Sequence, residues 1–309
     1  MPASDERPSD SNPAKPRWKN LIGFCVGTTL LAAAAWVVWH DRDKLSEAAA
    51  HARIASWWRI ALLMSLPWAS WTLTSVMYWV LMNRNDRRGT RQHVRLGEMH
   101  AVLASAWLLN YLPARPGMFG RLAYHKAVND IPLRESVRSS IVAIACGVAG
   151  VLLLVGVTLA ARALHADTTT TLVVLASPSL CACVAAAALR SREAASRTTW
   201  ALALRYADVL GWMARYLVLF DVVGRPLSLL EAAAFTAVSQ AASMVPLVGN
   251  GLGVREWANG LLAPSLPVGI ARGLALSVEL LHRAAEVTAA LPVGLVGGFL
   301  VAKRMHTAK

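Results

Sequence analysis

The chain has 309 residues, of which 56% are hydrophobic and only 16% are charged. Its mean hydropathy is +0.44, and this balance excludes an ordinary soluble domain. The formal net charge is +13. The Lys and Arg residues behind it lie between apolar runs, where they would face lipid headgroups, so we expect no nucleic-acid partner. The composition therefore predicts an integral membrane protein.

The polar stretch 1–19 is rich in Pro and Ser and is predicted to be a disordered cytoplasmic tail. The apolar run that follows it, 20–39, has the length of a full membrane span. We therefore interpret it as a retained transmembrane helix and not as a cleaved signal segment.

Six apolar runs are long enough, or nearly so, to cross a membrane, which takes about 20 apolar residues. In chain order they are 20–39, 60–82, 139–161, 168–189, 206–223 and 271–302. Two shorter runs, 99–112 and 232–246, are each stopped by a proline. We expect an all-α polytopic membrane protein with about six full transmembrane helices plus two broken or re-entrant helices.

Each short run leads through Gly-containing backbone to an Arg. After Asn110-Tyr111-Leu112-Pro113 the chain passes Gly117 and reaches Arg121. After Pro246 it passes three glycines and reaches Arg255. Two interrupted segments at corresponding places in two halves of a membrane chain indicate a transporter-like site.

Lys and Arg in short loops mark the cytoplasmic side, and here they concentrate in 15–19, 84–95, 190–205 and 303–309. Six crossings with both termini inside leave neither broken run free to cross. Both would be re-entrant, the first from the cytoplasm and the second from outside. This order indicates an inverted repeat. The predicted halves are 20–162 and 168–303, with a short cytoplasmic tail at 304–309.

One alternative is left open for the second broken run. The stretch 229–248 is long enough to span. It would then be an ordinary seventh crossing that is kinked at Pro246.

Non-helical backbone at membrane depth requires an enclosed polar pocket, because an unpaired peptide group in lipid is costly. The N-terminus of a restarted helix favours an anion, and neighbouring Arg side chains add positive charge. We therefore predict a lipid-headgroup site that consists of Asn110, Pro113, Arg115, Gly117, Arg121, Pro246, Gly249, Gly251, Gly253, Arg255 and Glu256. The alternative is that these Arg side chains extend to ordinary lipid phosphates at the interface.

Charged or titratable residues inside predicted spans suggest function by default. Those predicted to line one interior cavity are Asp208, Arg215, Glu279, His282, Arg283 and Glu286. Glu279 and Arg283 are four residues apart, as are His282 and Glu286, so each pair is predicted to meet on one helix face. We interpret the set as a gate or coupling network. The alternative is a purely structural polar network that joins the two halves.

Hydrolytic and metal chemistry find little support in the sequence. The His residues do not cluster with carboxylates at ligand spacing, and HExxH, Gly-x-Ser-x-Gly and P-loop patterns do not occur. We expect no enzymatic activity, no cofactor and no metal. An intramembrane lipid-modifying enzyme that depends on His282 or Glu286 is a third interpretation.

At its two broken segments the chain resembles the flippase-like transmembrane family named after the membrane part of bacterial lysylphosphatidylglycerol synthases. The resemblance rests on Asn110 to Pro113, on Gly117 and Arg121, on the stretch from Pro246 to Glu256, and on Arg283. It covers about 18–303. It implies a multi-pass protein of the bacterial cytoplasmic (inner) membrane that binds and moves a phospholipid, isoprenoid lipid or glycolipid.

The chain departs from this family in two places. Met118 stands where the family usually has an acidic residue, and 139–151 carries no charge where the family usually has an Asp-Arg pair. We therefore expect a headgroup other than a cationic one. No aminoacyl-transferase domain follows the last span, so lipid aminoacylation is not expected.

The expected function is that of a flippase-like transporter whose partners are membrane lipids with anionic headgroups. The alternative is a non-transporting membrane partner or scaffold of a separate lipid- or polysaccharide-modifying enzyme. The sequence indicates no oligomeric state.

Overall fold

The computed structural model describes residues 56–83, 94–112, 115–244, 249–267 and 269–307, together with four isolated residues between 29 and 39. Within these ranges the chain forms nine α-helices and no strand, which confirms the all-α class. The predicted span 20–39 lies almost wholly outside the described residues, and Pro113 and Pro246 lie outside them too.

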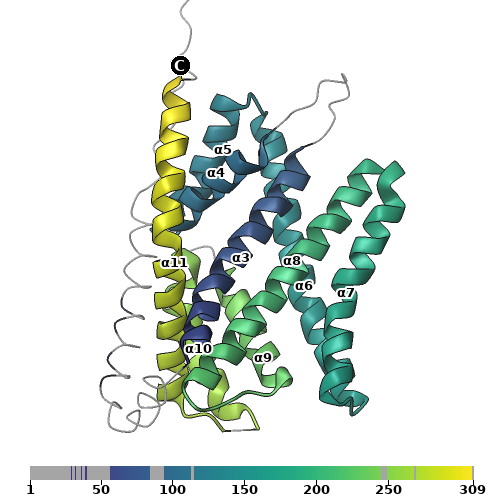
Figure 1. The fold of residues 1–309 in the computed structure, drawn as a ribbon, viewed down its shortest axis with the longest axis vertical. Coiled ribbons are helices and arrows are strands. Elements are labelled where there is room, and N and C mark those ends of the chain that lie inside the picture. Colours follow the sequence, from purple (N-terminus) through teal and green to yellow (C-terminus); the bar gives the residue numbers. More distant parts are fainter. Residues whose placement is uncertain are drawn as a thin grey trace, which may run out of the picture.

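Figure 1 shows the arrangement of the helices. In chain order they are α3 (Trp57–Met82), α4 (Leu96–Leu109), α5 (Pro116–Val128), α6 (Leu133–Ala163), α7 (Thr168–Ala188), α8 (Glu193–Val222), α9 (Leu229–Ser243), α10 (Val254–Leu262) and α11 (Arg272–Thr307). Each predicted apolar run in the described ranges coincides largely with one helix. Several helices are longer than the runs because polar residues at the run ends still hydrogen-bond as helix. Thus α11 continues through most of the predicted tail 304–309.

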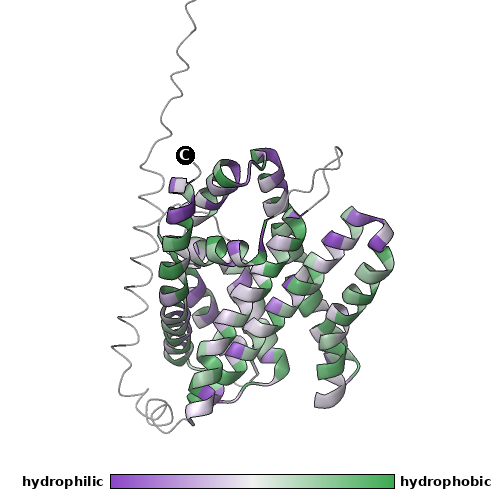
Figure 2. Ribbon diagram, turned by 45° about the horizontal axis from the view of Figure 1, so that its top comes forward, coloured by the Kyte–Doolittle hydropathy of each residue, from purple (hydrophilic) through white to green (hydrophobic). Residues whose placement is uncertain are grey.

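Four helical segments are long and apolar enough to cross a membrane: α3, α6, Thr168–Ser191 and α11. The predicted fifth span falls within α8, which has 30 residues but is not among these four. Large apolar side chains face outward, such as Leu152, Leu180 and Phe299, which are 65%, 64% and 70% exposed. Hydrophobic residues also dominate α7 and α11 in Figure 2, and hydrophilic residues gather near helix ends. These features are consistent with a membrane protein.

The two pairs of broken helices extend towards opposite ends of the molecule, while their breaks approach each other, with Arg115 Nη2 donating to the carbonyl oxygen of Ser243 at 2.8 Å. Figure 1 shows α4 and α5 near the end where α11 finishes, which we call the α5 end, and α9 and α10 near the other, which we call the α10 end. Helices α6 and α8 run from the α5 end to the α10 end, and α3, α7 and α11 run in the reverse direction. The most extensive helix contacts join α3 to α8, α4 to α11, α7 to α8 and α6 to α8, and α6 also contacts α9.

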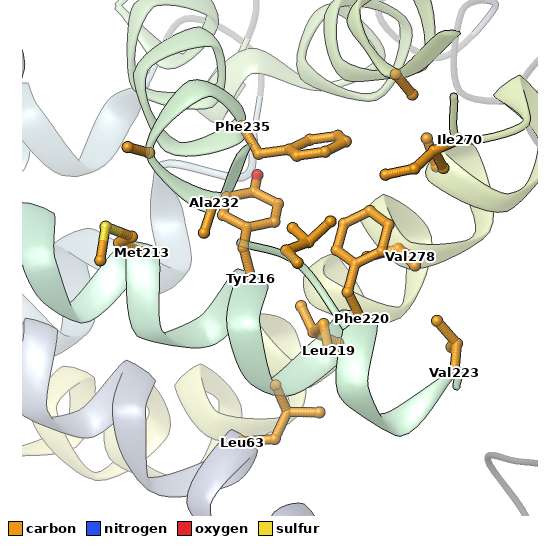
Figure 3. Packing of buried hydrophobic residues seen from close by; sticks show 14 of the residues in the cluster. Leu63, Met213, Tyr216, Leu219, Phe220, Val223, Ala232, Phe235, Ile270 and Val278 are labelled. Atoms are coloured by element: carbon orange, nitrogen blue, oxygen red, sulfur yellow. The ribbon is translucent and has the colours of Figure 1, made fainter. Parts of the chain in front are cut away.

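Hydrophobic packing fills the space between α3, α8, α9 and α11 towards the α10 end. Figure 3 shows Leu63, Leu219, Phe220, Phe235 and Val278 in this cluster. The rings of Phe220 and Phe235 lie 4.8 Å apart, measured between centroids. Densely packed apolar side chains therefore fill the space between these four helices.

Both predicted breaks interrupt the helices. After α4, the Oδ1 atom of Asn110 accepts a hydrogen bond of 3.1 Å from the backbone N–H of Met118 in α5, which ties the two sides of the first break together. After α9, Gly251 and Gly253 adopt φ values of 67° and 77° before α10 begins. Glycine suits both positions because it has no Cβ to clash in left-handed backbone.

Gly117 marks a close approach of α5 to α4. A Cβ added there would lie 2.1 Å from the carbonyl oxygen of Ala106, whereas one added at Gly120 in the same helix would meet nothing within 4 Å. We predict that Gly117→Ala lowers the free energy of unfolding by about 1–3 kcal/mol, as overpacking does. The control Gly120→Ala should leave it unchanged or raise it slightly. Thermal unfolding of the purified protein in detergent measures both, and equal effects would contradict the close approach.

Candidate functional site

A cavity of about 360 Å³ lies where the two broken segments meet. Residues of α3, α4, α5, α6, α8, α9, α10 and α11 contribute to its wall. Its charged lining residues are Arg115, Arg121, Arg205, Arg215, Arg255, Asp208 and Glu286. Five Arg minus two carboxylates leave an excess of three positive charges on the lining, one of which, on Arg255, is offset by Glu279 behind it. Such a cavity attracts an anion.

The structure brings many of the predicted site residues to this cavity. Those that line it are Asn110, Arg115, Arg121, Asp208, Arg215, Arg255 and Glu286. The other described ones do not line it and lie in the breaks or the buried network: Gly117, Gly249, Gly251, Gly253, Glu256, Glu279, His282 and Arg283. Pro113 and Pro246 are outside the described residues.

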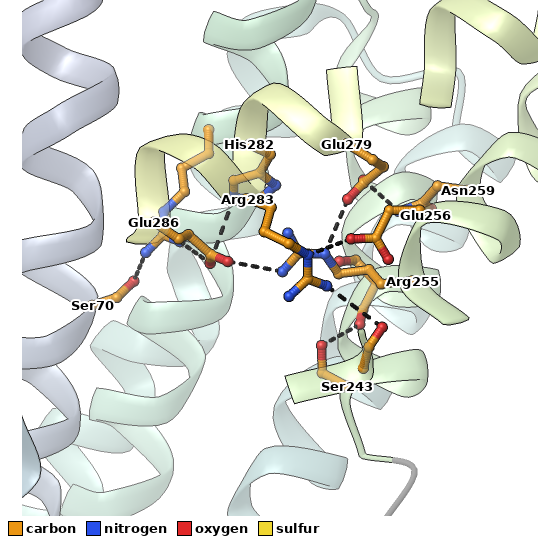
Figure 4. A network of polar contacts seen from close by, with 12 residues as sticks. Ser70, Ser243, Arg255, Glu256, Asn259, Glu279, His282, Arg283 and Glu286 are labelled. Atoms are coloured by element: carbon orange, nitrogen blue, oxygen red, sulfur yellow. Dashed lines mark hydrogen bonds and ion pairs between the residues drawn. The ribbon is translucent and has the colours of Figure 1, made fainter. Parts of the chain in front are cut away.

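A network of buried ion pairs joins α8, α10 and α11 next to the cavity (Figure 4). Arg255 donates from Nε to Glu279 Oε2 and from Nη1 to Glu286 Oε2, each at 3.0 Å. The other oxygen of Glu286 accepts a bond of 2.9 Å from Nη1 of Arg215. One carboxylate on α11 thereby holds Arg residues from both α8 and α10.

The same network continues towards the α10 end. Arg283 forms an ion pair with Glu256, the residue next to Arg255 in α10. Asn259 donates from Nδ2 to Glu279 Oε1 at 2.6 Å, and the Tyr216 hydroxyl donates to the same oxygen. Every carboxylate of this network therefore has a cationic partner from another helix.

The predicted pair Glu279 with Arg283 on one face of α11 is not formed. Instead, both residues bind α10, through Arg255 and Glu256 respectively. The physical reason is that a buried charge left without a partner is strongly destabilising. If Glu279 and Arg283 paired with each other, the charges of α10 would lack these partners. The predicted proximity of His282 and Glu286 is present, with 3.8 Å between His282 Nε2 and Glu286 Oε1.

Arg121 is held differently from Arg255. Its side chain is almost buried, with the residue 6% exposed, and Nη2 donates to the Ser140 hydroxyl at 2.8 Å. Its guanidinium carbon lies 3.7 Å from the centre of the Tyr78 ring. Within the described residues no ion pair joins it to a carboxylate.

Some lining residues were not found from the sequence. Arg205 forms an ion pair with Asp208 and donates from Nη2 to Gln240 Oε1 at 2.9 Å. Its place three residues before Asp208 was a usable signal, because i and i+3 share a helix face. Trp212, whose ring lies 4.8 Å from the Arg215 guanidinium carbon and 5.3 Å from that of Arg255, gave no such signal within an apolar run.

The restarted helix contributes less to an anion site than the sequence predicts. Pro116 occupies the first position of α5 and has no N–H, and the N–H of Met118 already donates to Asn110. The charged groups that the first half contributes to the cavity are thus the side chains of Arg115 and Arg121. Among the described residues, no three His, Cys, Asp or Glu side chains gather as a metal site would require.

Comparison with known protein families, curated proteins and solved structures gives no match for this chain. The geometry of the cavity and its ion pairs therefore carries the functional argument.

Removing one carboxylate of the buried network tests its energetic role. In Glu286→Gln both Arg215 and Arg255 lose an ionic partner, and breaking a buried pair in this way costs about 3–5 kcal/mol of stability. The control is Glu193→Gln, because the ion pair of Glu193 with Arg197 is a surface pair whose carboxylate is 51% exposed. Its loss should cost less than about 1 kcal/mol. Unfolding of both variants in detergent checks this, and a Glu286→Gln protein as stable as the control would contradict it.

Proposed function

We propose that this protein is a flippase-like membrane transporter that binds the anionic headgroup of an amphipathic lipid and moves it across the bilayer. The observation that carries the proposal is the cavity lined by five Arg and two carboxylates at the meeting point of two broken helices. Broken helices at membrane depth are tolerated where they line a polar cavity, and many transporters bind their substrate at such a place.

The packing of the helices supports an inverted repeat. In that repeat α3, α4, α5 and α6 correspond to α8, α9, α10 and α11, and Figure 1 shows that α3 and α8, like α6 and α11, run in opposite directions. If each helix is replaced by its counterpart in the other half, the contact of α4 with α11 becomes the contact of α9 with α6, and both contacts are present. The same replacement turns the contact of α3 with α11 into the contact of α8 with α6, and both of these are present too. The contact of α3 with α8 converts into itself, as expected for two helices that face each other across a pseudo-two-fold axis.

Charge at the helix ends supports an orientation. Arg190, Arg192, Lys303 and Arg304 belong to helix ends at the α5 end of the molecule. An excess of Lys and Arg marks the cytoplasmic side, so the α5 end faces the cytoplasm. The run 20–39 and α8 complete six crossings in the bacterial inner membrane, with both termini inside. The resemblance to the lysylphosphatidylglycerol synthase membrane part agrees with this arrangement.

The position of the cavity suggests how access alternates. Lining residues such as Tyr78, Arg121 and Arg205 belong to the α5-end portions of α3, α5 and α8. The ion pairs of α10 with α11 and the hydrophobic cluster fill the opposite side. In this state the cavity faces the cytoplasm and the α10 end is closed. In the opposite state, α10 and α11 separate while α4 and α5 close over the headgroup.

The inverted arrangement predicts labelling from opposite sides of the membrane. Lys126 near the end of α5 and Ser265 after α10 are both exposed. Each is replaced by a single Cys in a protein without its four native cysteines and treated with an impermeant thiol reagent. Lys126→Cys should react only from the cytoplasmic side, and Ser265→Cys only from outside. Labelling of both from one side would exclude the inverted arrangement.

Lipid movement by purified protein in vesicles tests the function directly. We expect the protein to speed the exchange of a fluorescent anionic lipid between leaflets. Arg121→Ala should slow it by about tenfold or more, since it removes charge that faces the headgroup. Arg255→Ala should slow it as well, because it removes the ion pairs that hold α10 to Glu279 and Glu286 on α11. Arg134→Ala is the matched control, because Arg134 is exposed in the first turn of α6 and does not line the cavity.

If both cavity variants fold and move lipid as fast as the control, the transporter proposal fails. If the wild type moves no lipid and instead co-purifies with a lipid- or polysaccharide-modifying enzyme, the non-transporting partner replaces it.

A further inference from the structure

His282 lies inside the buried network but forms none of its hydrogen bonds. The side chain is fully buried, and its ring packs edge-on against the rings of Trp212 and Tyr216, with the centroids 5.1 Å apart in both cases. Among the described residues, neither ring nitrogen has a hydrogen-bond partner. Nε2 lies 3.8 Å from Oε1 of Glu286 on the same helix (Figure 4). A buried polar group without a partner is costly, which indicates a role beyond packing.

The network around His282 is electrically balanced while the imidazole is neutral. Its ion pairs use three Arg and three Glu side chains, whose charges cancel. With one phenol, these groups surround the ring from three helices: Arg215 and Tyr216 on α8, Arg255 and Glu256 on α10, and Glu279, Arg283 and Glu286 on α11. Each carboxylate already has an Arg partner, so a proton on His282 would add a positive charge that the network does not balance. An anion that arrives with the proton would balance it.

The cavity is the place from which such an anion reaches the network. Arg255 and Glu286 belong to both, because they line the cavity and form an ion pair with each other. Among the described residues, Nη2 of Arg255 has no hydrogen-bond partner, so it can donate to an anion in the cavity. Glu286 connects the cavity with His282, which does not line it. The carboxylate of Glu286 can therefore pass a proton from the cavity to the imidazole.

We infer that His282 binds one proton when the anionic headgroup enters the cavity, so that lipid movement is coupled to the proton. This inference rests on the proposed function and names its coupling ion. The proton comes from water in the cavity and binds the lone pair of a ring nitrogen, and no covalent bond breaks in the protein or the lipid. An imidazolium and a singly charged headgroup together add no net charge, whereas either one alone does. By linkage, each of the two ligands then raises the affinity for the other.

Protonation of His282 also helps α10 to leave α11. Glu286 now has two cationic partners, Arg215 and Arg255. If Arg255 turns to the headgroup, the carboxylate loses one of them. An imidazolium at His282 replaces it, because Nε2 can donate to Oε1 of Glu286 from the same helix. Arg255 can therefore move with the headgroup without leaving a buried carboxylate short of positive charge.

Proton uptake on lipid binding tests the inference with the purified chain in phosphatidylcholine nanodiscs. The probe is short-chain phosphatidylglycerol, because a phosphodiester keeps its single charge between pH 5 and 8, the range in which His changes its charge. Calorimetric titrations in two buffers with different ionisation enthalpies give the number of protons bound per lipid. We expect an uptake that approaches one proton. Because binding takes up a proton, it should tighten as the pH falls, by up to about tenfold per pH unit.

The decisive variant is His282→Gln, which keeps a polar side chain that cannot hold the proton. It should bind phosphatidylglycerol without proton uptake and with an affinity that is independent of pH. His125→Gln is the matched control, because His125 is also buried with a ring nitrogen that lacks a partner among the described residues. This control should keep the uptake. Wild-type binding without proton uptake overturns the inference, and unchanged uptake in folded His282→Gln overturns the role of His282.

A second variant keeps the assignment testable if His282→Gln does not fold. The chain has eight His residues. A protein in which the other seven are replaced by Gln should still take up the proton when it binds phosphatidylglycerol. If this single-His protein folds and binds the lipid without proton uptake, the assignment to His282 fails.

Transport in vesicles separates this inference from the proposed function. A pH gradient should make the wild type accumulate fluorescent phosphatidylglycerol in the leaflet that faces the alkaline side, faster than in protein-free vesicles, because lipid and proton move together. Lipid exchange that ignores the gradient would overturn the coupling and leave the transporter. Proton uptake in nanodiscs without any lipid movement would remove the transporter and leave the proton site at His282.

Discussion

The need to pair buried charge governs the centre of this protein. Arg255 is 1% exposed, and a guanidinium in such a place is tolerated only when acceptors surround it. Its two carboxylate partners come from α11, and one of them also holds Arg215 of α8. The short helix α10 is thereby fixed against the two long helices, and the second break is enclosed by protein.

The cavity lies next to this network, and the Arg residues of its two halves differ in their partners. On the second half, carboxylates neutralise the Arg residue that follows the break, and hydrophobic packing closes the space behind it. On the first half, Arg121 follows the first break and has a hydroxyl and an aromatic ring as neighbours. The second half therefore has its Arg255 neutralised by carboxylates, whereas Arg121 in the first half has no carboxylate partner among the described residues. In the proposed inverted repeat, the two halves would share a backbone plan while their side chains differ.

Close backbone contacts give the broken helices their positions. Gly294 and Gly297 of α11 face α4, where a Cβ would come within 2.7 Å of Leu108 Cβ and 2.5 Å of the Ala101 carbonyl oxygen, respectively. Gly117 allows a similar contact between α5 and α4. Small residues permit such approach between helices that gain little from the hydrophobic effect in lipid. The first break is thus held from both sides, which keeps Arg121 aimed at Ser140.

The sequence by itself determined the helical class, the breaks after α4 and α9, and several charged residues that meet in one cavity. These follow from local rules: apolar run length sets helices, and proline and glycine end them. Only the tertiary structure decided that Glu279 binds Arg255 instead of Arg283, and that Ser140, Tyr78 and Arg205 join the cavity. Those contacts depend on how each helix is rotated about its axis and on which neighbour it meets. The burial of charge determines the rotation and the neighbour of each helix, because each buried charge needs a partner. Residue spacing along one helix does not specify which residue of another helix that partner is.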